Sequence, residues 1–192
     1  MSILVYIEHS EGKVKNTSLE AVSFAKALAT QTGEGDVVAL ALGIVDAAEL
    51  ASVGKAGAAK VLNADDSRLN DGVIQAHAGA VAQAFSTLGA KTLVLAKSSL
   101  GDAVASRLAI KLGAGLVSNV VELPDTSSGY KVKRSIYTGK AFAETKVTTE
   151  NKILAVKKNA VDLKIDGNEA SVEKLEVKLS DSDFASKITN TE

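Results

Sequence analysis

The sequence contains no cysteine, which excludes disulfides and thiolate metal sites. Aromatic residues are scarce as well: they make up 4% of the 192 residues, whereas hydrophobic residues make up 46%. Ala, Val and Leu must therefore do most of the packing in the core. Small apolar side chains of this kind suit helices that lie closely on a sheet.

The chain also lacks an excess of charge of either sign. It has 22 basic and 23 acidic residues and a formal net charge of −1, which argues against a nucleic-acid-binding surface. The first residues, MSILVYIEH, lack the charged leader and apolar run of a signal peptide. No stretch approaches the roughly 18 apolar residues of a membrane span. We expect a soluble, cytoplasmic protein.

Apolar runs and helical patterns alternate over the first 115 residues. Strands are predicted at residues 3–7, 37–42, 60–63 and 92–96, and helices at 17–30, 46–51, 71–88 and 102–112. Thr17 with Glu20, and Asp46 with Glu49, have the spacing of a capping box. Because the strands are apolar on both faces and alternate with helices, they predict a three-layer α/β/α fold around a mostly parallel sheet.

The helical patterns stop after residue 115. Four strand-like runs follow without helices between them, at residues 116–123, 131–137, 142–148 and 153–156. They predict antiparallel strands added to the sheet edge, or a small hairpin layer. We therefore expect an α/β N-terminal domain over residues 1–160. Residues 161–192 are acidic and poor in large apolar residues, and predict a connector with one exposed strand at 175–179 and a helical turn from Ser180.

Three glycine motifs resemble phosphate-binding loops only in part. Gly54-Lys55 and Gly139-Lys140 lack the glycine five positions earlier and the Ser or Thr after the lysine that a P-loop needs. Gly113-Ala114-Gly115 follows a helix, whereas a dinucleotide-binding fingerprint follows a strand. All three are interpreted as turns or helix ends.

The two histidines do not predict a metal or acid–base site. His9 ends the first strand, where open α/β sheets bind ligands, and His77 lies within a long helix. Glu8 is adjacent to His9, but successive strand residues point to opposite faces. No third metal ligand is evident. Both histidines are interpreted as structural or solvated.

Polar residues between strands and helices are weaker candidates. Asp65, Asp66 and Asp71 suggest a cation site, but aspartates in such positions more often cap a helix. Ser98 and Ser99 precede a helix and could donate hydrogen bonds to a phosphate at its N-terminus. The residues by themselves indicate a nucleotide-binding type of fold without indicating a reaction.

Several segments together resemble the electron transfer flavoprotein α subunit. Arg134-x-Ile136-Tyr137-x-Gly139-x-Ala141 is similar to that family's Arg-x-Ile-Tyr-x-Gly-Asn-Ala segment. Residues 3–9 resemble its first strand, 100–109 a helix, and 116–120 the next strand. Order and spacing agree over residues 1–160 and more loosely to 185. The departures are Asp102, Ser106 and Lys140, where the family often has Lys, Pro and Asn.

The resemblance implies the N-terminal domain of an α subunit, with a Rossmann-like fold of the adenine-nucleotide-hydrolase type. It implies FAD in a second domain that this chain does not contain, and a heterodimer with a β subunit that holds AMP. Catalytic, cofactor-binding and metal residues are not expected in this chain. Arg134, Tyr137, Gly139 and Lys140 are expected to be scaffold or interface residues.

The function implied by the resemblance is that of an electron carrier rather than of a catalyst with its own substrate. Electrons would come from flavoprotein dehydrogenases, as in fatty acid β-oxidation, and pass to a quinone oxidoreductase or a similar acceptor. An apolar partner face is expected, with the helix at residues 76–85 as a candidate.

An alternative reading is a stand-alone, stress-type α/β domain that binds AMP or ATP. Its site would form at strand ends near His9, Gly43 and Ser98. The lack of a recognisable glycine-rich phosphate loop weighs against this reading.

Overall fold

The structure is a computed structural model that describes residues 2–189. The strands of the main sheet are β1 Ile3–Tyr6, β4 Val37–Leu42, β5 Lys60–Ala64, β6 Thr92–Ala96, β7 Gly115–Val120, β8 Tyr130–Ile136, β9 Ala141–Val147, β10 Lys152–Val156 and β11 Ser171–Lys174. A separate small ribbon contains β2 His9–Ser10 and β3 Lys13–Val14. The α-helices are α1 Asn16–Thr32, α2 Ala47–Ser52, α3 Ile74–Thr87 and α4 Ser99–Leu112. The 3₁₀ turns are η1 Val53–Ala56, η2 Ser67–Leu69, η3 Tyr137–Gly139 and η4 Asp181–Phe184.

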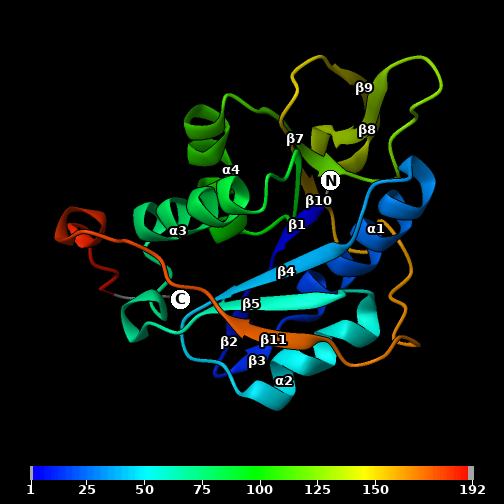
Figure 1. The fold of residues 1–192 in the computed structure, drawn as a ribbon. Helices are drawn as coiled ribbons and strands as arrows, with labels where there is room; N and C mark the ends of the chain where they lie inside the picture. The colour runs from blue at the N-terminus through cyan, green and yellow to red at the C-terminus, as the bar shows by residue number, and fades with distance from the viewer. Residues whose placement is uncertain (1, 190–192) are drawn as a thin grey trace.

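One nine-stranded sheet forms the middle layer, in the order β11-β5-β4-β1-β6-β10-β7-β8-β9 (Figure 1). All neighbours from β11 to β7 are parallel, and β8 and β9 are added antiparallel at the edge. Helices cover both faces (Figure 1). The predicted three-layer α/β/α fold with a mostly parallel sheet is therefore confirmed.

The continuous apolar strands have a simple cause, which is that the sheet is buried on both sides. In β1, Val5 belongs to a core that also contains Phe24 of α1, whereas Leu4 and Tyr6 belong to a second core with Phe85 of α3. All five side chains are nearly inaccessible to solvent. Successive strand residues point to opposite faces, so both faces need apolar residues.

The strand β10 enters the sheet between β6 and β7, parallel to both. The prediction of antiparallel strands is therefore wrong for the runs 116–123 and 153–156, which form β7 and β10 in the parallel part of the sheet because β10 pairs with two parallel neighbours. It is confirmed for the β8–β9 hairpin, which is antiparallel and lies at the sheet edge. The hairpin brings Val147, the end of β9, beside Gly115, the start of β7: a Cβ built on Gly115 would lie 2.8 Å from a Val147 methyl carbon. Only a short loop is therefore needed to connect the end of β9 to the start of β10, which lies beside β7.

The edge strand beyond β5 lies earlier in the chain than predicted. It is β11, residues 171–174, and the predicted strand at 175–179 is wrong. Leu175, Val177 and Leu179 alternate because they pack, partly buried, against the core under α3 and α4 without pairing as a strand. The predicted turn after Ser180 is confirmed as η4, which has a capping box between Ser180 and Asp183.

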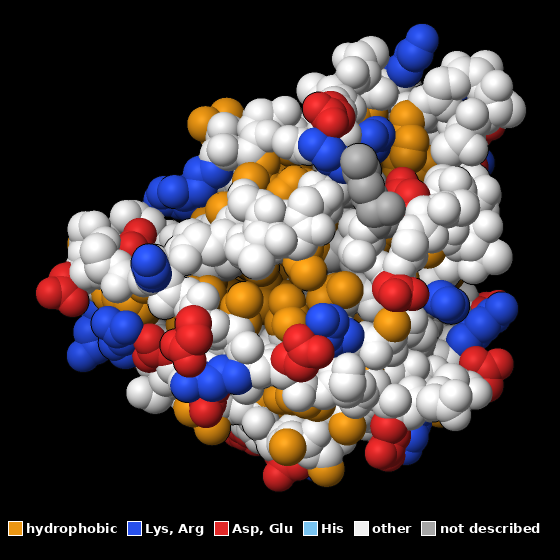
Figure 2. Space-filling model, in the orientation of Figure 1, with side chains coloured by type: hydrophobic (Ala, Val, Ile, Leu, Met, Phe, Trp, Pro, Cys, Tyr) orange, Lys and Arg blue, Asp and Glu red, His pale blue; other side chains and the backbone are white. Residues whose placement is uncertain are grey.

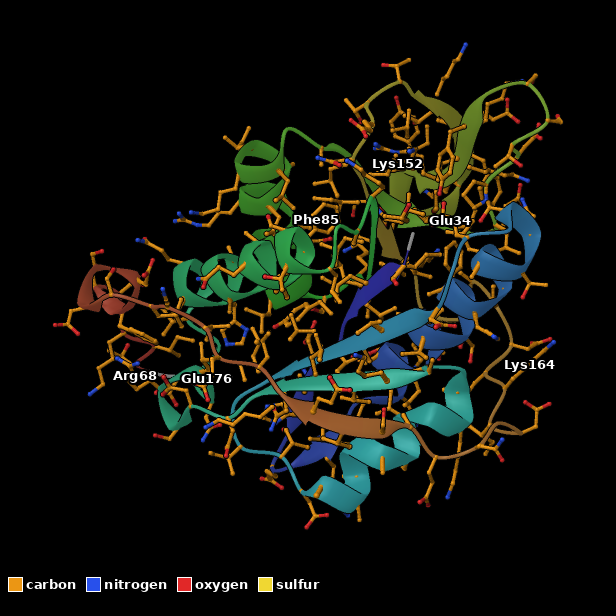
Figure 3. The ribbon with its side chains drawn as sticks, viewed as in Figure 1. Glu34, Arg68, Phe85, Lys152, Lys164 and Glu176 are labelled. Atoms are coloured by element: carbon orange, nitrogen blue, oxygen red, sulfur yellow. The ribbon has the colours of Figure 1, made fainter. Side chains whose placement is uncertain are left out.

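The segment at residues 175–184 lies against α3 and η2. The guanidinium of Arg68 stacks over the Phe184 ring at 4.6 Å, and Arg68 points toward this segment in Figure 3. Gln83 of α3 donates to the Lys178 carbonyl at 2.8 Å and accepts from the Lys178 amide at 2.9 Å. Apolar and polar contacts together therefore hold the segment on the domain.

The helices α1 and α2 were predicted correctly, but the side-chain contacts at their first residues were predicted less well. α1 begins at Asn16 without a side-chain cap, so the Thr17–Glu20 capping box is wrong. Glu20 instead accepts a hydrogen bond from the Asn159 amide at 2.7 Å, a contact distant in sequence. Asp46 does cap α2, but Glu49 turns away from it to accept from the Val14 amide at 3.0 Å.

The helix at residues 76–85 is not an exposed partner face. Its apolar residues are buried within this chain, namely Ala76, Ala78, Ala80, Val81, Ala84 and Phe85. Figure 2 shows apolar side chains gathered near the centre of one face and charged side chains mostly around them. Within residues 2–189 we find no helix with the length and apolar character needed to span a membrane.

Candidate functional site

The carboxyl edge of the sheet contains the topological switch point. The chain passes from β1 through α1 to β4 on one side, and from β5 through α3 to β6 on the other side of β1. Open α/β sheets bind ligands in the crevice at such a point. The residues that meet there are Glu8 after β1 and Lys97 and Ser98 after β6.

The carboxylate of Glu8 occupies this position. Glu8 is only 5% exposed, and its Oε2 lies 2.9 Å from Lys15 Nζ. Ser98 Oγ donates a hydrogen bond to the other carboxylate oxygen of Glu8. The same hydroxyl accepts from the Gly101 amide at 2.8 Å and so caps α4. Ser98 is therefore fully engaged within the chain, and the anion at this helix N-terminus is the chain's own carboxylate.

The loop after β1 fixes the Glu8 carboxylate in place. The Glu8 amide donates to Ser18 Oγ at 2.8 Å, and the Glu8 carbonyl accepts from the Lys15 amide at 2.9 Å. These contacts tie the end of β1 to the start of α1. A phosphate at the switch point would meet a buried negative charge, so these residues do not fit one.

His9 and Gly43 form a second packed cluster on the other side of β1. His9 Nε2 donates to the Leu42 carbonyl at 2.8 Å. Gly43 has φ of 99°, and a Cβ there would lie 2.5 Å from Asn70 Oδ1. The Gly43 backbone is thus packed closely against Asn70 and His9. The buried Glu8 carboxylate at Ser98 and the close packing at Gly43 weigh against the AMP- or ATP-binding alternative at His9, Gly43 and Ser98.

His77 is a buried structural residue, as interpreted from the sequence. Tyr6 donates its hydroxyl to His77 Nδ1 at 2.7 Å, and Nε2 donates to the Leu69 carbonyl at 2.8 Å. Burial is the main factor that lowers the pKa of His77 from its ordinary value. The ring therefore stays neutral at pH 7 and can accept from Tyr6.

Asp66 and the three glycine motifs are structural too. Asp66 caps η2 by accepting from the Arg68 amide at 3.0 Å, as expected for a cap. Gly54-Lys55 lies in η1, Gly113 ends α4 with φ of 56°, and Gly139 closes η3, so the turn interpretations are confirmed. No group of three His, Asp or Glu side chains suited to a metal ion occurs among residues 2–189.

The residues singled out by resemblance gather at the tip of the β8–β9 hairpin. Arg134 is on β8, Tyr137 and Gly139 form η3, and Lys140 follows. Tyr137 is 77% exposed, and it adopts a left-handed backbone with φ of 48°. The tip lies at the carboxyl edge of the sheet, where it lines a cleft with the residues that follow β6 and β10.

Sequence reasoning missed two lysines beside this tip. Lys97 and Lys157 line a cleft of about 520 Å³ together with Arg134 and Tyr137. Each lysine directly follows a buried strand, β6 or β10. Their position at the carboxyl ends of parallel strands is the sequence signal that could have identified them as candidate site residues.

Replacing Glu8 with glutamine should lower the free energy of unfolding by about 1 kcal/mol. The amide can still accept from Ser98, but the ion pair with Lys15 is lost. The loss is modest because the Lys15 side chain is 44% exposed and can be hydrated instead. Urea denaturation measures the change. Glu11→Gln, at an exposed carboxylate nearby, is the control and should change stability little; equal effects at both positions would contradict a role for the Glu8 contacts.

The amino-acid sequence is similar to those of known proteins. The sequence profile of the Electron transfer flavoprotein domain family matches residues 3–180. The chain is 27% identical to the electron transfer flavoprotein subunit alpha of Bacillus subtilis over 186 residues, which cover 93% of this chain and 55% of that protein. It is 26% identical to the subunit of the same name from Mycobacterium tuberculosis (strain H37Rv), over 83% of this chain and 48% of the relative.

A probable mitochondrial subunit alpha from Caenorhabditis elegans is 26% identical over 90% of this chain and 50% of the relative. The chain thus spans about half the length of the curated relatives it matches.

Proposed function

Because this chain belongs to the electron transfer flavoprotein domain family, we propose that it forms the N-terminal domain of an α subunit of a flavin electron carrier. The family match over residues 3–180 carries this proposal. The relatives described above are named as α subunits, and the matched region is about half of each. In this proposal residues 1–160 are the domain, and residues 161–192, of which 171–184 pack against it, lead toward the flavin-binding half.

The switch point of this chain contributes a platform rather than a cofactor site. At the switch point the Glu8 carboxylate and the Ser98 hydroxyl satisfy each other, and this arrangement does not fit a nucleotide phosphate. We therefore assign FAD to the other half of the subunit and AMP to the β partner. When bound, the flavin supplies the redox chemistry, and protein supplies orientation and electrostatics. Flavoprotein dehydrogenases and a quinone oxidoreductase are the proposed electron donors and acceptor.

The tip of the β8–β9 hairpin is the proposed contact with the β subunit, through Arg134, Tyr137, Gly139 and Lys140. Tyr137 supports this assignment because a 77% exposed aromatic ring is unusual in a chain with 4% aromatic residues. Exposed Tyr and Arg side chains are typical anchors of protein interfaces. The tip also holds Tyr137 and Thr138 in left-handed backbone conformations, which fix its shape.

Co-expression with the electron transfer flavoprotein β subunit of the same organism tests the proposal. The two chains should elute together in size-exclusion chromatography, and titration calorimetry should give a saturable affinity. Tyr137→Ala should weaken binding by about tenfold or more. Ile110→Ala is the matched control, because Ile110 is an 86% exposed apolar residue on α4, away from the hairpin.

Failure of the wild-type chain to bind the β subunit would contradict the subunit role. Equal binding by wild type and Tyr137→Ala would leave the subunit role standing, but it would remove the hairpin tip from the interface.

A further inference from the structure

We propose that the cleft beside the hairpin tip binds the phosphate group of a small molecule. The cleft lies at the carboxyl ends of β6, β7 and β10, and its lining includes Lys97, Asn119, Arg134, Tyr137 and Lys157. Its volume of about 520 Å³ is within the usual range for small-molecule sites. The cleft adjoins the switch point and shares Lys97 with it. This inference does not depend on the proposed subunit role.

The charge of the cleft favours an anion. Lys97, Arg134 and Lys157 come from three different strands or strand ends and converge on one cavity. Asp102 is the opposing charge, since its Oδ2 lies 3.0 Å from Lys97 Nζ. Within residues 2–189, neither Arg134 nor Lys157 forms an ion pair with a carboxylate. The cleft therefore keeps a surplus of positive charge.

Arg134 carries an unsatisfied donor at this position. Its Nε is buried and has no hydrogen-bond partner among the described residues. A buried donor without a partner is costly, and a charged one more so. A guanidinium can donate two parallel hydrogen bonds to two phosphate oxygens, while a lysine ammonium adds a point charge. A phosphate between Arg134 and Lys157 would satisfy both.

The backbone around the cleft is held in an unusual conformation. Five non-glycine residues among the described ones have positive φ, and three of them, Asn119, Tyr137 and Thr138, line this cleft at φ of 60°, 48° and 56°. Such conformations persist where the surroundings enforce them, and they concentrate at functional sites. Gly139 adjoins them, and a Cβ on it would lie 3.7 Å from Lys157 Nζ. The strained turn thus shapes the wall that faces the lysine.

The neighbouring switch point explains why this cleft is the better anion site. There the chain's own Glu8 carboxylate occupies the α4 N-terminus and engages Ser98. Here the carboxylate in contact with a cleft lysine is that of Asp102, which pairs with Lys97 and also accepts from Ser118 Oγ at 3.0 Å. An incoming phosphate is repelled at the first position and attracted at the second.

The test is a titration of the ¹⁵N-labelled chain with AMP, inorganic phosphate and adenosine at low ionic strength. AMP and phosphate should give saturable amide shifts centred on residues 119, 134–139 and 157, whereas adenosine should not. Binding should weaken as salt is added, because the contacts are ionic.

Two variants make the site falsifiable. Lys157→Gln should weaken AMP binding about tenfold, since it removes one charged contact to the phosphate. Lys146→Gln removes an exposed lysine at the opposite end of the same hairpin and should bind as wild type. Thermal unfolding should show that both variants are folded. No saturable shift with AMP or phosphate, shifts centred on Glu8 and His9, or unchanged binding by Lys157→Gln would each overturn the proposal.

Discussion

Replacing Gly54 with alanine should detach residues 167–174 from the sheet and lower the free energy of unfolding by about 3 kcal/mol. A Cβ at this position would lie 2.2 Å from the Ala170 amide nitrogen and 2.5 Å from the Asn168 carbonyl oxygen. Both are backbone atoms, so no side-chain rotation relieves the clash. The hydrogen bonds that dock this segment, from the Gly167 amide to Lys55 and from the Ala170 amide to Ala51, should be lost together.

Hydrogen exchange separates this effect from a general loss of stability. In Gly54→Ala the amides of β11 should exchange much faster, while those of β1 and β6 remain protected. Lys55→Ala is the matched control at the next residue. Its ion pair with Glu169 joins two largely exposed side chains at 3.4 Å, so the change should stay below about 0.5 kcal/mol. Protected β11 amides in Gly54→Ala would show that the segment is docked by other contacts.

Replacing Tyr6 with phenylalanine should lower the free energy of unfolding by about 2 kcal/mol. The side chain keeps its shape, but His77 Nδ1 loses the hydroxyl that donates to it at 2.7 Å. Both residues are nearly inaccessible to solvent, so water cannot replace the hydroxyl. Because burial lowers the pKa of His77, the ring is neutral at pH 7 and its nitrogen remains an unsatisfied acceptor.

Tyr137→Phe provides the same chemical change at an exposed position. The Tyr137 ring is 77% exposed, so its hydroxyl is hydrated in the folded and unfolded states. The change in unfolding free energy should be within about 0.5 kcal/mol. Urea denaturation of both variants at pH 7 gives the comparison. A loss in Tyr6→Phe no larger than that in Tyr137→Phe would show that the Tyr6–His77 hydrogen bond contributes little.

The fold class could be predicted because it depends on local patterns. Runs such as residues 37–42 are apolar without alternation, and only a strand buried on both faces needs that composition. The position of β11 could not be predicted, because its residues are exposed and mostly polar and it forms only by pairing with β5. The prediction of a capping box at the start of α1 was wrong for a related reason. Glu20 accepts a hydrogen bond from the distant Asn159 amide instead of capping the helix.

The candidate sites were predictable only in part. The hairpin tip could be singled out from its sequence, because Arg134, Tyr137 and Gly139 form a recognisable segment. The approach of Lys97 and Lys157 to that tip depends on β10 lying next to both β6 and β7. No local pattern specifies that neighbour relation. The engagement of Ser98 by Glu8 likewise joins residues far apart in the chain.

The insertion of β10 has a consequence for how the chain reaches its native state. β10 is among the last strands to be synthesised, yet it lies between β6 and β7. Until residue 156 has left the ribosome, those two strands have unpaired edges, which are prone to association with other chains. Pairings between such distant segments also make folding slow. We therefore expect the nascent domain to depend on chaperone protection until β10 is available, and then to complete its sheet in one cooperative step.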